Sequence, residues 1–318
     1  MLEIFHTYPW SLVVLTGALG LAIGSFLNVV IHRLPASWDR EQIEGIADWS
    51  EMAADNLDHS LPKATPEERA ALRAGLTGSA VLFRRVRGHL PHETIVRPRS
   101  RCPSCGHQIT AIENVPVLSY LALRGRCSAC KAPISLRYPL IEAFCGLTAA
   151  AIAWKFGVSL QTPAALLLFF WLVPLAMIDA DTSLLPNSGT LPLLWAGLLF
   201  NVFGLFEPLP EAVLGAIVGY LFLAIPSWIY EMLKRIPEAM GRGDFTLMAL
   251  FGAWFGWPAI LPVVLLSSCV AVAVSLPLMA MGKRDLLSKI PFGPYIAGAG
   301  MIYLFFGPAL KEVISLPF

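Results

Sequence analysis

Residues 241–256 read GRGDFTLMALFGAWFG, a run that sets one aspartate, Asp244, at the start of an apolar segment. A carboxylate at the mouth of a membrane helix is costly because hydrocarbon does not solvate a charge, so a sequence usually retains one there for a function. A second aspartate, Asp179, lies in a similar position at the end of another apolar segment. Together they suggest an aspartyl protease within a membrane, in which one carboxylate activates a water molecule and the other donates a proton to the peptide carbonyl oxygen.

The composition is that of a membrane protein. Of the 318 residues, 56% are hydrophobic and 14% are charged, and the mean hydropathy is +0.64, whereas soluble domains carry about 25% charged residues. The fold class predicted is all-α, a polytopic membrane helix bundle of about eight spans, because eight apolar stretches approach the length that crosses a bilayer of roughly 30 Å. They lie near 9–31, 138–157, 162–181, 189–206, 210–233, 245–257, 258–281 and 291–308. The sixth is short enough to be a half-helix or a tilted span.

The basic residues predict the orientation of this bundle. No Lys or Arg precedes the first stretch, which argues against a cleavable signal peptide, and basic residues follow it at His32-Arg33. The positive-inside rule then puts the N-terminus outside and residues 32–137 in the cytoplasm. With eight alternating spans, all but two of the 23 Lys and Arg residues fall on the cytoplasmic side. Both aspartates are then expected at the cytoplasmic membrane boundary.

Three regions are expected along the chain. Residues 1–35 form the first transmembrane helix, residues 36–137 a cytoplasmic domain, and residues 138–318 the transmembrane aspartyl protease core. Within the second region, residues 36–95 are polar with charges of both signs, which predicts a small helical insert on the membrane surface. Its helix is expected to start at Thr65-Pro66-Glu67-Glu68, where Thr65 caps, proline fits the first turn and Glu68 returns a hydrogen bond to the cap.

A basic cluster follows in the same insert, at Arg84, Arg85 and Arg87. Contact with anionic lipid head groups is its plainest interpretation, and a specific ligand site is the alternative. Membrane lipid is therefore an expected partner, and nucleic acid is not.

Four cysteines predict a metal site in the cytoplasmic domain. Cys102, Cys105, Cys127 and Cys130 form two CxxC pairs, and four thiolates at this spacing can close a tetrahedral zinc site. Gly106 after the first pair permits the tight turn of a zinc knuckle. Because cysteines fill all four positions and leave none for water, the zinc is expected to be structural. A redox pair, or two unrelated turns, are the other interpretations.

The GxGD string is weak by itself, since most such strings are turns and Asp is a common helix cap. Asp179 alone could equally be an interfacial acid paired with a base, and Asp181 lies beside it. The two aspartates are stronger evidence together, because both fall at helix ends on the same side of the membrane.

Further motifs extend along the chain in order and with specific spacing. They are Gly24-Ser25-Phe26-Leu27-Asn28-Val29-Val30-Ile31-His32-Arg33-Leu34-Pro35, the two CxxC pairs with Glu113-Asn114-Val115-Pro116 between them, Arg137-Tyr138-Pro139-Leu140-Ile141-Glu142, Ile178-Asp179-Ala180-Asp181 with Leu184-Leu185-Pro186, Gly241-Arg242-Gly243-Asp244-Phe245 with Gly252-Ala253-Trp254, and Pro291-Phe292-Gly293-Pro294-Tyr295. In these motifs the chain resembles the type IV prepilin peptidases, or prepilin leader peptidase/N-methyltransferases, a family of GxGD-type membrane aspartyl proteases.

The resemblance implies an activity. Such enzymes cleave the basic leader of type IV prepilins and type II secretion pseudopilins after a glycine, at the cytoplasmic face of the bacterial inner membrane. Many then methylate the new N-terminal amine with S-adenosylmethionine. The family's catalytic aspartates map onto Asp179 and Asp244, and its zinc cysteines onto the four cysteines above. Since no GxGxxG follows a predicted strand, the residues that would bind S-adenosylmethionine are not predicted.

The chain departs from the family's pattern at two positions. The family usually has Asp after the proline at 186 and Lys two residues after the GxGD aspartate, but this chain has Asn187 and Thr246. Neither change removes a proposed catalytic group. Without a lysine near Asp244, however, the titration of the aspartate pair is expected to differ from that of relatives.

The helix ends predict how the pair shares its proton. Asp244 begins a helix, where the dipole favours negative charge, whereas Asp179 ends one next to Asp181, where negative charge is disfavoured. On this basis Asp244 is expected to be the ionised base and Asp179 the protonated acid, although the titration belongs to the pair.

Two rival functions remain open at this point. One is a leader peptidase without methylation. The other is a membrane scaffold whose zinc knuckle binds a partner and whose aspartates are structural. The sequence does not predict the oligomeric state or which pilins are substrates.

Overall fold

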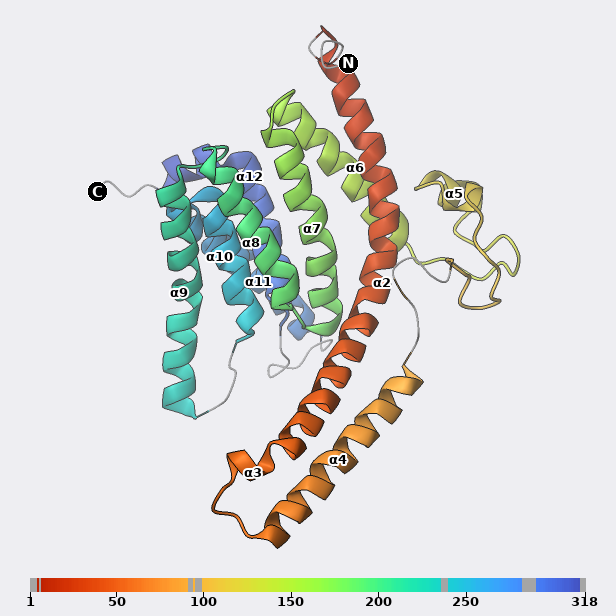
Figure 1. The fold of residues 1–318 in the computed structure, drawn as a ribbon. Helices are drawn as coiled ribbons and strands as arrows, with labels where there is room; N and C mark the ends of the chain where they lie inside the picture. Colours follow the sequence, from red (N-terminus) through yellow and green to blue (C-terminus); the bar gives the residue numbers. More distant parts are fainter. Residues whose placement is uncertain are drawn as a thin grey trace. The chain divides into compact units, whose positions relative to one another are not determined.

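A computed structural model describes residues 5, 7–90, 94, 99–235, 240–281 and 290–314, without the side chains of 311–314. These residues contain helices and loops but no strand, apart from two isolated β-bridges (Figure 1). The predicted all-α class is therefore confirmed. The chain divides into two compact units, residues 1–28 with 111–318, and residues 29–110.

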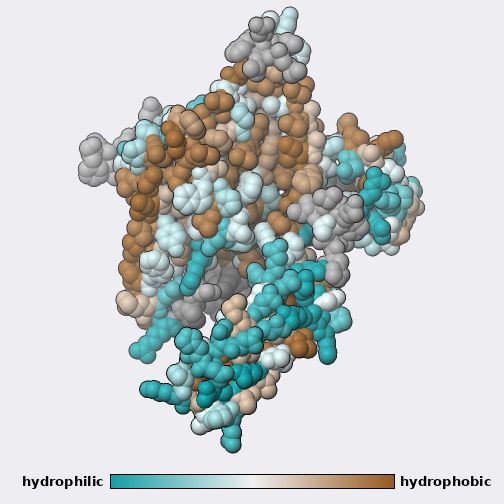
Figure 2. Space-filling view, in the orientation of Figure 1, coloured by the Kyte–Doolittle hydropathy of each residue, from teal (hydrophilic) through white to brown (hydrophobic). Residues whose placement is uncertain are grey.

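All eight apolar stretches of the sequence are helical. Their bounds are α2 (Pro9–Asp55), α6 (Arg137–Phe156), α7 (Gln161–Thr182), α8 (Asn187–Val202), α9 (Leu209–Lys234), α10 (Arg242–Phe255), α11 (Ile260–Ala280), which the short helix η2 (Trp257–Ala259) precedes, and α12 (Gly293–Ile314). Six of them, α2, α6, α7, α9, α11 with η2, and α12, are long and apolar enough to cross a membrane. Apolar side chains cover much of the surface of these helices (Figure 2).

Helix α10, the predicted half-helix or tilted span, is a buried central helix. It has 14 residues, about 21 Å at 1.5 Å per residue, which is shorter than a bilayer core of roughly 30 Å. Every residue from Asp244 to Phe255 is buried, because α8, α9 and α12 pack around it. Gly256, with φ of 74°, ends the helix in a backbone conformation that favours glycine. Its surroundings are protein, so α10 does not need the length of a lipid-facing span.

Glycines let α10 approach its neighbours closely. A Cβ at Gly215 of α9 would collide with the Gly252 carbonyl, and one at Gly219 would lie 2.6 Å from the Met248 carbonyl. Gly300 of α12 is in the same situation against the ring of Phe251. Small residues that allow backbones to touch are a common way to pack membrane helices, since van der Waals contact replaces the hydrophobic driving force.

The second unit contains a helical hairpin. Helix α2 continues through Pro35, although proline has no amide proton to donate to the Ile31 carbonyl. The helix ends at Asp55, 20 residues beyond the predicted end of the first transmembrane helix at residue 35. The short α3 (Leu57–Ser60) and then α4 (Pro66–His89) follow, and α4 runs back beside α2.

Ion pairs join the two arms of the hairpin. Arg87 pairs with Glu44 at 2.9 Å, and Arg84 pairs with both Asp48 and Glu51. Arg84 and Arg87 thus have partners within the protein, and contact of the arginine cluster with lipid head groups stays a prediction.

The predicted start of α4 is confirmed. Thr65 Oγ1 accepts a hydrogen bond from the Glu68 amide, and Glu68 Oε2 accepts one from the Thr65 amide at 2.8 Å. These bonds lower the pKa of Glu68, with the Thr65 backbone contact as the larger cause.

Candidate functional site

Asp179 lies in the last turn of α7. Its side chain is buried, with 4% of the residue exposed. The helix ends at Ser183, which has a left-handed φ of 54° and donates its amide to the Asp179 carbonyl at 2.7 Å. The chain therefore turns away just after the aspartate, and the carboxylate is held at the end of the helix inside the bundle.

Asp244 lies in the first turn of α10 and is also buried. The carboxylate lies close to the glycine that caps this helix, since a Cβ at Gly241 would be in ordinary van der Waals contact with Asp244 Oδ2, at 3.4 Å. The charges of Asp244 and Asp179 interact with each other. The fold thus buries two carboxylates that are 65 residues apart in sequence and near enough for their charges to interact.

A third segment completes this region. The amide of Gly293, the first residue of α12, donates a hydrogen bond to Asp179 Oδ2 at 3.1 Å. Leu185 lies between the two aspartate segments: its carbonyl is in close contact with Gly243, and its side chain lies 3.4 Å from where a Cβ of Gly293 would be. Leu185 before α8, Gly243 of α10 and Gly293 of α12 therefore lie close together beside the two carboxylates. Sequence reasoning quoted the motif that contains Gly293 but gave it no role.

Asp181 has a different environment from its neighbour Asp179. It is exposed and accepts two hydrogen bonds from Arg137 at the start of α6, at 3.0 and 2.6 Å. The structure thus separates two aspartates that the sequence alone could not, since one is buried beside Asp244 and the other is half of a surface ion pair.

The two departures from the family's pattern lie together. Thr246 Oγ1 is 3.0 Å from Asn187 Oδ1, 2.9 Å from Thr190 Oγ1 and 2.8 Å from the Gly243 carbonyl. A threonine hydroxyl has one proton to donate and can accept twice. It can therefore donate to the Asn187 amide oxygen or to the Gly243 carbonyl, and accept from the Thr190 hydroxyl.

Two of the motifs around the first helix also meet. Asn28 Nδ2 of α2 donates to the Tyr138 carbonyl of α6 at 3.2 Å, and a Cβ at Gly24 would lie 3.0 Å from the Cα of Glu142. The buried Glu142 carboxylate accepts the amide of Val117 at 2.8 Å. These polar contacts tie α6 to α2 and to the loop before it, and none of these residues is among the predicted site residues.

The four cysteines form two similar turns. The Cys102 amide donates to the His107 carbonyl and the Cys127 amide to the Ala132 carbonyl, both at 2.9 Å. After the second cysteine of each pair comes a residue with positive φ, Gly106 at 71° as expected, and Lys131 at 61°.

The turns bring the thiols together. All four Sγ atoms lie within 4.8 Å of one another, and a tetrahedral zinc ion with Zn–S bonds of about 2.3 Å would hold them roughly 3.8 Å apart. A set of four cysteine sulfurs at such distances fits a closed zinc site, so this cluster could hold the metal.

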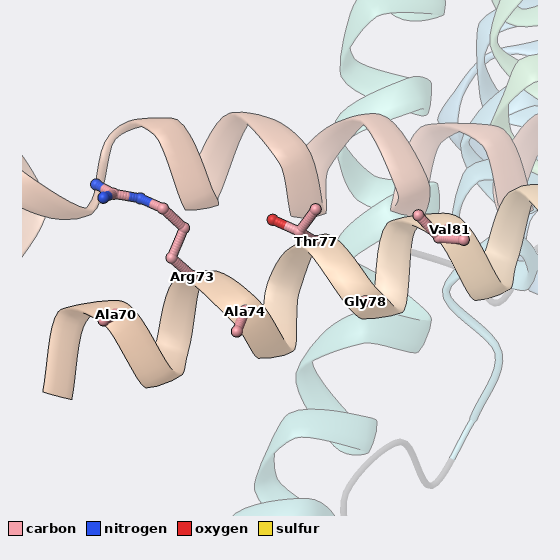
Figure 3. A pocket seen from close by; sticks show the side chains of 6 residues that line it. All are labelled: Ala70, Arg73, Ala74, Thr77, Gly78 and Val81. Carbon is pink, nitrogen blue, oxygen red and sulfur yellow. The ribbon is translucent and has the colours of Figure 1, made fainter. Parts of the chain in front are cut away.

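A shallow groove runs along α4 (Figure 3). It is lined by Ala70, Arg73, Ala74, Thr77, Gly78 and Val81. None of these is a predicted site residue, and Arg73 is paired with Asp58 at 3.0 Å. We assign no ligand to it.

Comparison with known proteins gives two family matches. Residues 18–156 match the bacterial peptidase A24 N-terminal domain, and residues 166–276, which include both aspartates, match the type IV leader peptidase family. No solved structure matches the chain.

Curated relatives match over nearly the full chain. A protein of Stutzerimonas stutzeri is 45% identical over 96% of this chain and 94% of its own length. Others from Aeromonas hydrophila and Pseudomonas aeruginosa are 42% and 40% identical, each over 98% of this chain and over 97% and 96% of their own lengths. All three are named prepilin leader peptidase/N-methyltransferase. The chain therefore belongs to the type IV leader peptidase family.

Proposed function

We propose that the protein cleaves the leader peptides of type IV prepilins and type II secretion pseudopilins, and that it then N-methylates the new N-terminal residue. The observation that carries the peptidase half is the pair of buried carboxylates, Asp179 and Asp244, whose charges interact although they come from different helices. The names of relatives at 40–45% identity support the methyltransferase half.

The chemistry follows from two carboxyl groups that share one proton. The ionised carboxylate takes a proton from water as the water oxygen attacks the carbonyl carbon of the scissile peptide, and the protonated carboxyl gives its proton to the carbonyl oxygen. The C–N bond of the tetrahedral intermediate then breaks, and the leaving amine takes up a proton. Like charges that are close in a buried site cannot both ionise readily, which favours this singly protonated pair.

The helix directions support a common location for the two aspartates. One ends α7 and the other begins α10, so both lie at the same end of the bundle. By the positive-inside rule this is the cytoplasmic face of the inner membrane, with the N-terminus outside. Part of the charge argument concerns Lys283, Arg284 and Lys289, which lie outside the described residues.

Two groups are implied besides the substrate. Cys102, Cys105, Cys127 and Cys130 would hold a structural zinc ion, which would stabilise the loop without an open position for catalysis. S-adenosylmethionine would supply the methyl group. The described residues contain no strand from which a glycine-rich nucleotide-binding turn could start, so we assign no residues to it.

Incubation of the purified protein with a prepilin and S-adenosylmethionine, followed by mass spectrometry, tests this function. Wild type should remove the leader and add about 14 Da to the mature chain. Asp179→Ala and Asp244→Ala should abolish cleavage, whereas Asp181→Ala, on the same helix as Asp179, should retain it. No cleavage by wild type would leave the scaffold alternative, and cleavage without the added mass would leave a leader peptidase alone.

A further inference from the structure

The Gly293 amide contacts one member of the carboxylate pair directly. The bond to Asp179 Oδ2 is 3.1 Å long, it is buried, and it joins residues 114 positions apart. Gly293 begins α12, so the carboxylate of Asp179 faces the N-terminus of a helix. The C-terminus of α7 disfavours negative charge on Asp179, whereas the Gly293 amide of α12 favours it.

The two carboxylates are therefore not equivalent. Each lies at a helix N-terminus, Asp244 in the first turn of α10 and Asp179 against α12. Only Asp179 accepts a hydrogen bond from a described residue. A direct hydrogen bond to a charged group stabilises it more than a helix dipole does. The balance thus favours negative charge on Asp179.

We propose that Gly293 is a positioning residue whose amide proton holds Asp179 as the ionised base and leaves the shared proton on Asp244. This reverses the assignment expected from the helix ends alone. The proposal rests on the proposed peptidase function and adds a group to it, since the amide would act through Asp179 and not on the substrate.

The glycine is needed for close approach. A Cβ at position 293 would lie 2.7 Å from Asp179 Oδ2 and 3.2 Å from its Cγ. Any side chain here would push the carboxylate off the amide. Gly298, on the same helix, has open space around it, so Gly298→Ala changes glycine content in α12 without a new contact.

Among the described residues, the ends of the helices that carry Asp179 and Asp244 bear few other charged side chains. Arg242 begins α10, and Asp181 lies on α7 itself, where Arg137 of α6 balances its charge. Asn187, at the start of α8, has no ionisable group. The amide of Gly293 is thus the main fixed donor for the ionised carboxylate.

The test removes the donor, although the ester also weakens the Phe292 carbonyl as an acceptor for the Tyr295 and Ile296 amides. An ester in place of the amide between Phe292 and Gly293 keeps the shape of the chain but deletes the proton. We expect kcat for prepilin cleavage to fall about tenfold to a hundredfold with KM unchanged. The acidic limb of the pH–rate profile should move to higher pH, because the ionised base has lost its stabilising partner. Gly293→Ala should behave in the same way, and Gly298→Ala like wild type.

Methyl transfer to a pilin that is already cleaved serves as the internal control for folding, together with the thermal unfolding midpoint. Wild-type kcat and pH profile in the ester variant would overturn the proposal. Equal loss of cleavage and methyl transfer, or an equal loss in Gly298→Ala, would also overturn it, since the effect would then be structural. Absence of cleavage in wild type would instead contradict the proposed function.

Discussion

Asn187 and Thr246 are hydrogen-bonded, with 3.0 Å between Oδ1 and Oγ1, although they are 59 residues apart. They occupy the two positions at which the resemblance leads one to expect Asp and Lys. The fold therefore places a neutral pair, close to Asp244, where the resemblance implies two opposite charges. Because both partners are neutral, this site holds neither a buried cation nor an unpaired acid, which would be costly.

A double-mutant cycle at these two positions tests whether they are coupled. Thr246→Lys alone should lower the thermal unfolding midpoint, because it buries a charge where 8% of the residue is exposed. Adding Asn187→Asp should recover stability, with a coupling free energy of about 0.5–3 kcal/mol. In Thr246→Lys the acidic limb of the cleavage pH profile should move to lower pH, since a nearby cation favours the ionised pair, and Asn187→Asp should reverse part of that shift. Additive effects of the two substitutions would contradict this coupling.

The ion pair between Asp181 and Arg137 should contribute little to stability, and Asp181 should not be needed for cleavage. The side chains of Arg137 and Asp181 are 39% and 43% exposed, so the ion pair is expected to contribute less than about 1 kcal/mol. Asp181→Asn should retain cleavage and lower the unfolding midpoint only slightly. The exchange Arg137→Asp with Asp181→Arg should restore what each single reversal loses. A complete loss of cleavage in Asp181→Asn would show that this residue has a direct role.

Zinc binding should weaken when the glycine of the first cysteine turn is replaced, and strengthen when a glycine is introduced at the matching position of the second turn. Gly106→Ala forces a side chain into a left-handed conformation and should weaken zinc binding. Lys131→Gly relieves the same conformation, but it also removes the bond from Lys131 Nζ to the Ser128 carbonyl. A gain of about 1–2 kcal/mol is expected from relief of the left-handed conformation, and competition with a chromophoric chelator measures it. Zinc content that is unaffected by Cys105→Ser would mean that the cluster is not the metal site.

Lys155 should compensate for a helix hydrogen bond that Pro308 cannot make. Pro308 has no amide proton for the Leu304 carbonyl one turn earlier in α12, and Lys155 Nζ of α6 donates to that oxygen at 2.8 Å. Lys155→Met should lower stability by about 1–3 kcal/mol. The cost should be smaller in a Pro308→Ala background, where an amide again pairs with Leu304. Equal costs in both backgrounds, measured by thermal unfolding, would exclude this account.

The cap of α4 predicts a local dependence on pH. The pKa of Glu68 is lowered by its bonds to Thr65, so its contribution is complete above the ordinary glutamate value of about 4.3 and is lost as pH falls through the lowered one. Hydrogen exchange in the first turn of α4, corrected for intrinsic rates, should accelerate over that interval. Thr65→Ala should weaken the turn by about 0.5–2 kcal/mol and remove the pH dependence. An unchanged profile in this variant would contradict the role of the cap.

The sequence by itself determined the helices, the capping box at Thr65, the cysteine cluster and the two aspartates at helix ends. These depend on apolar runs, local hydrogen bonds and short spacings, which neighbouring residues fix. It also supplied the motifs that match the family. It placed a helix at residues 245–257 but could not tell whether α10 was a span or a buried core helix, because an apolar run looks the same in lipid and in protein.

Only the tertiary structure decided which groups surround each aspartate. The Gly293 amide donates to Asp179, 114 residues away in sequence. Asp181 points away from that site and pairs with Arg137, and Thr246 is hydrogen-bonded to Asn187. No local pattern encodes such contacts, because they arise where helix ends far apart in sequence pack together. The preference of a carboxylate for its proton depends on these neighbours, so the sequence could name the pair while the fold decides how the two members differ.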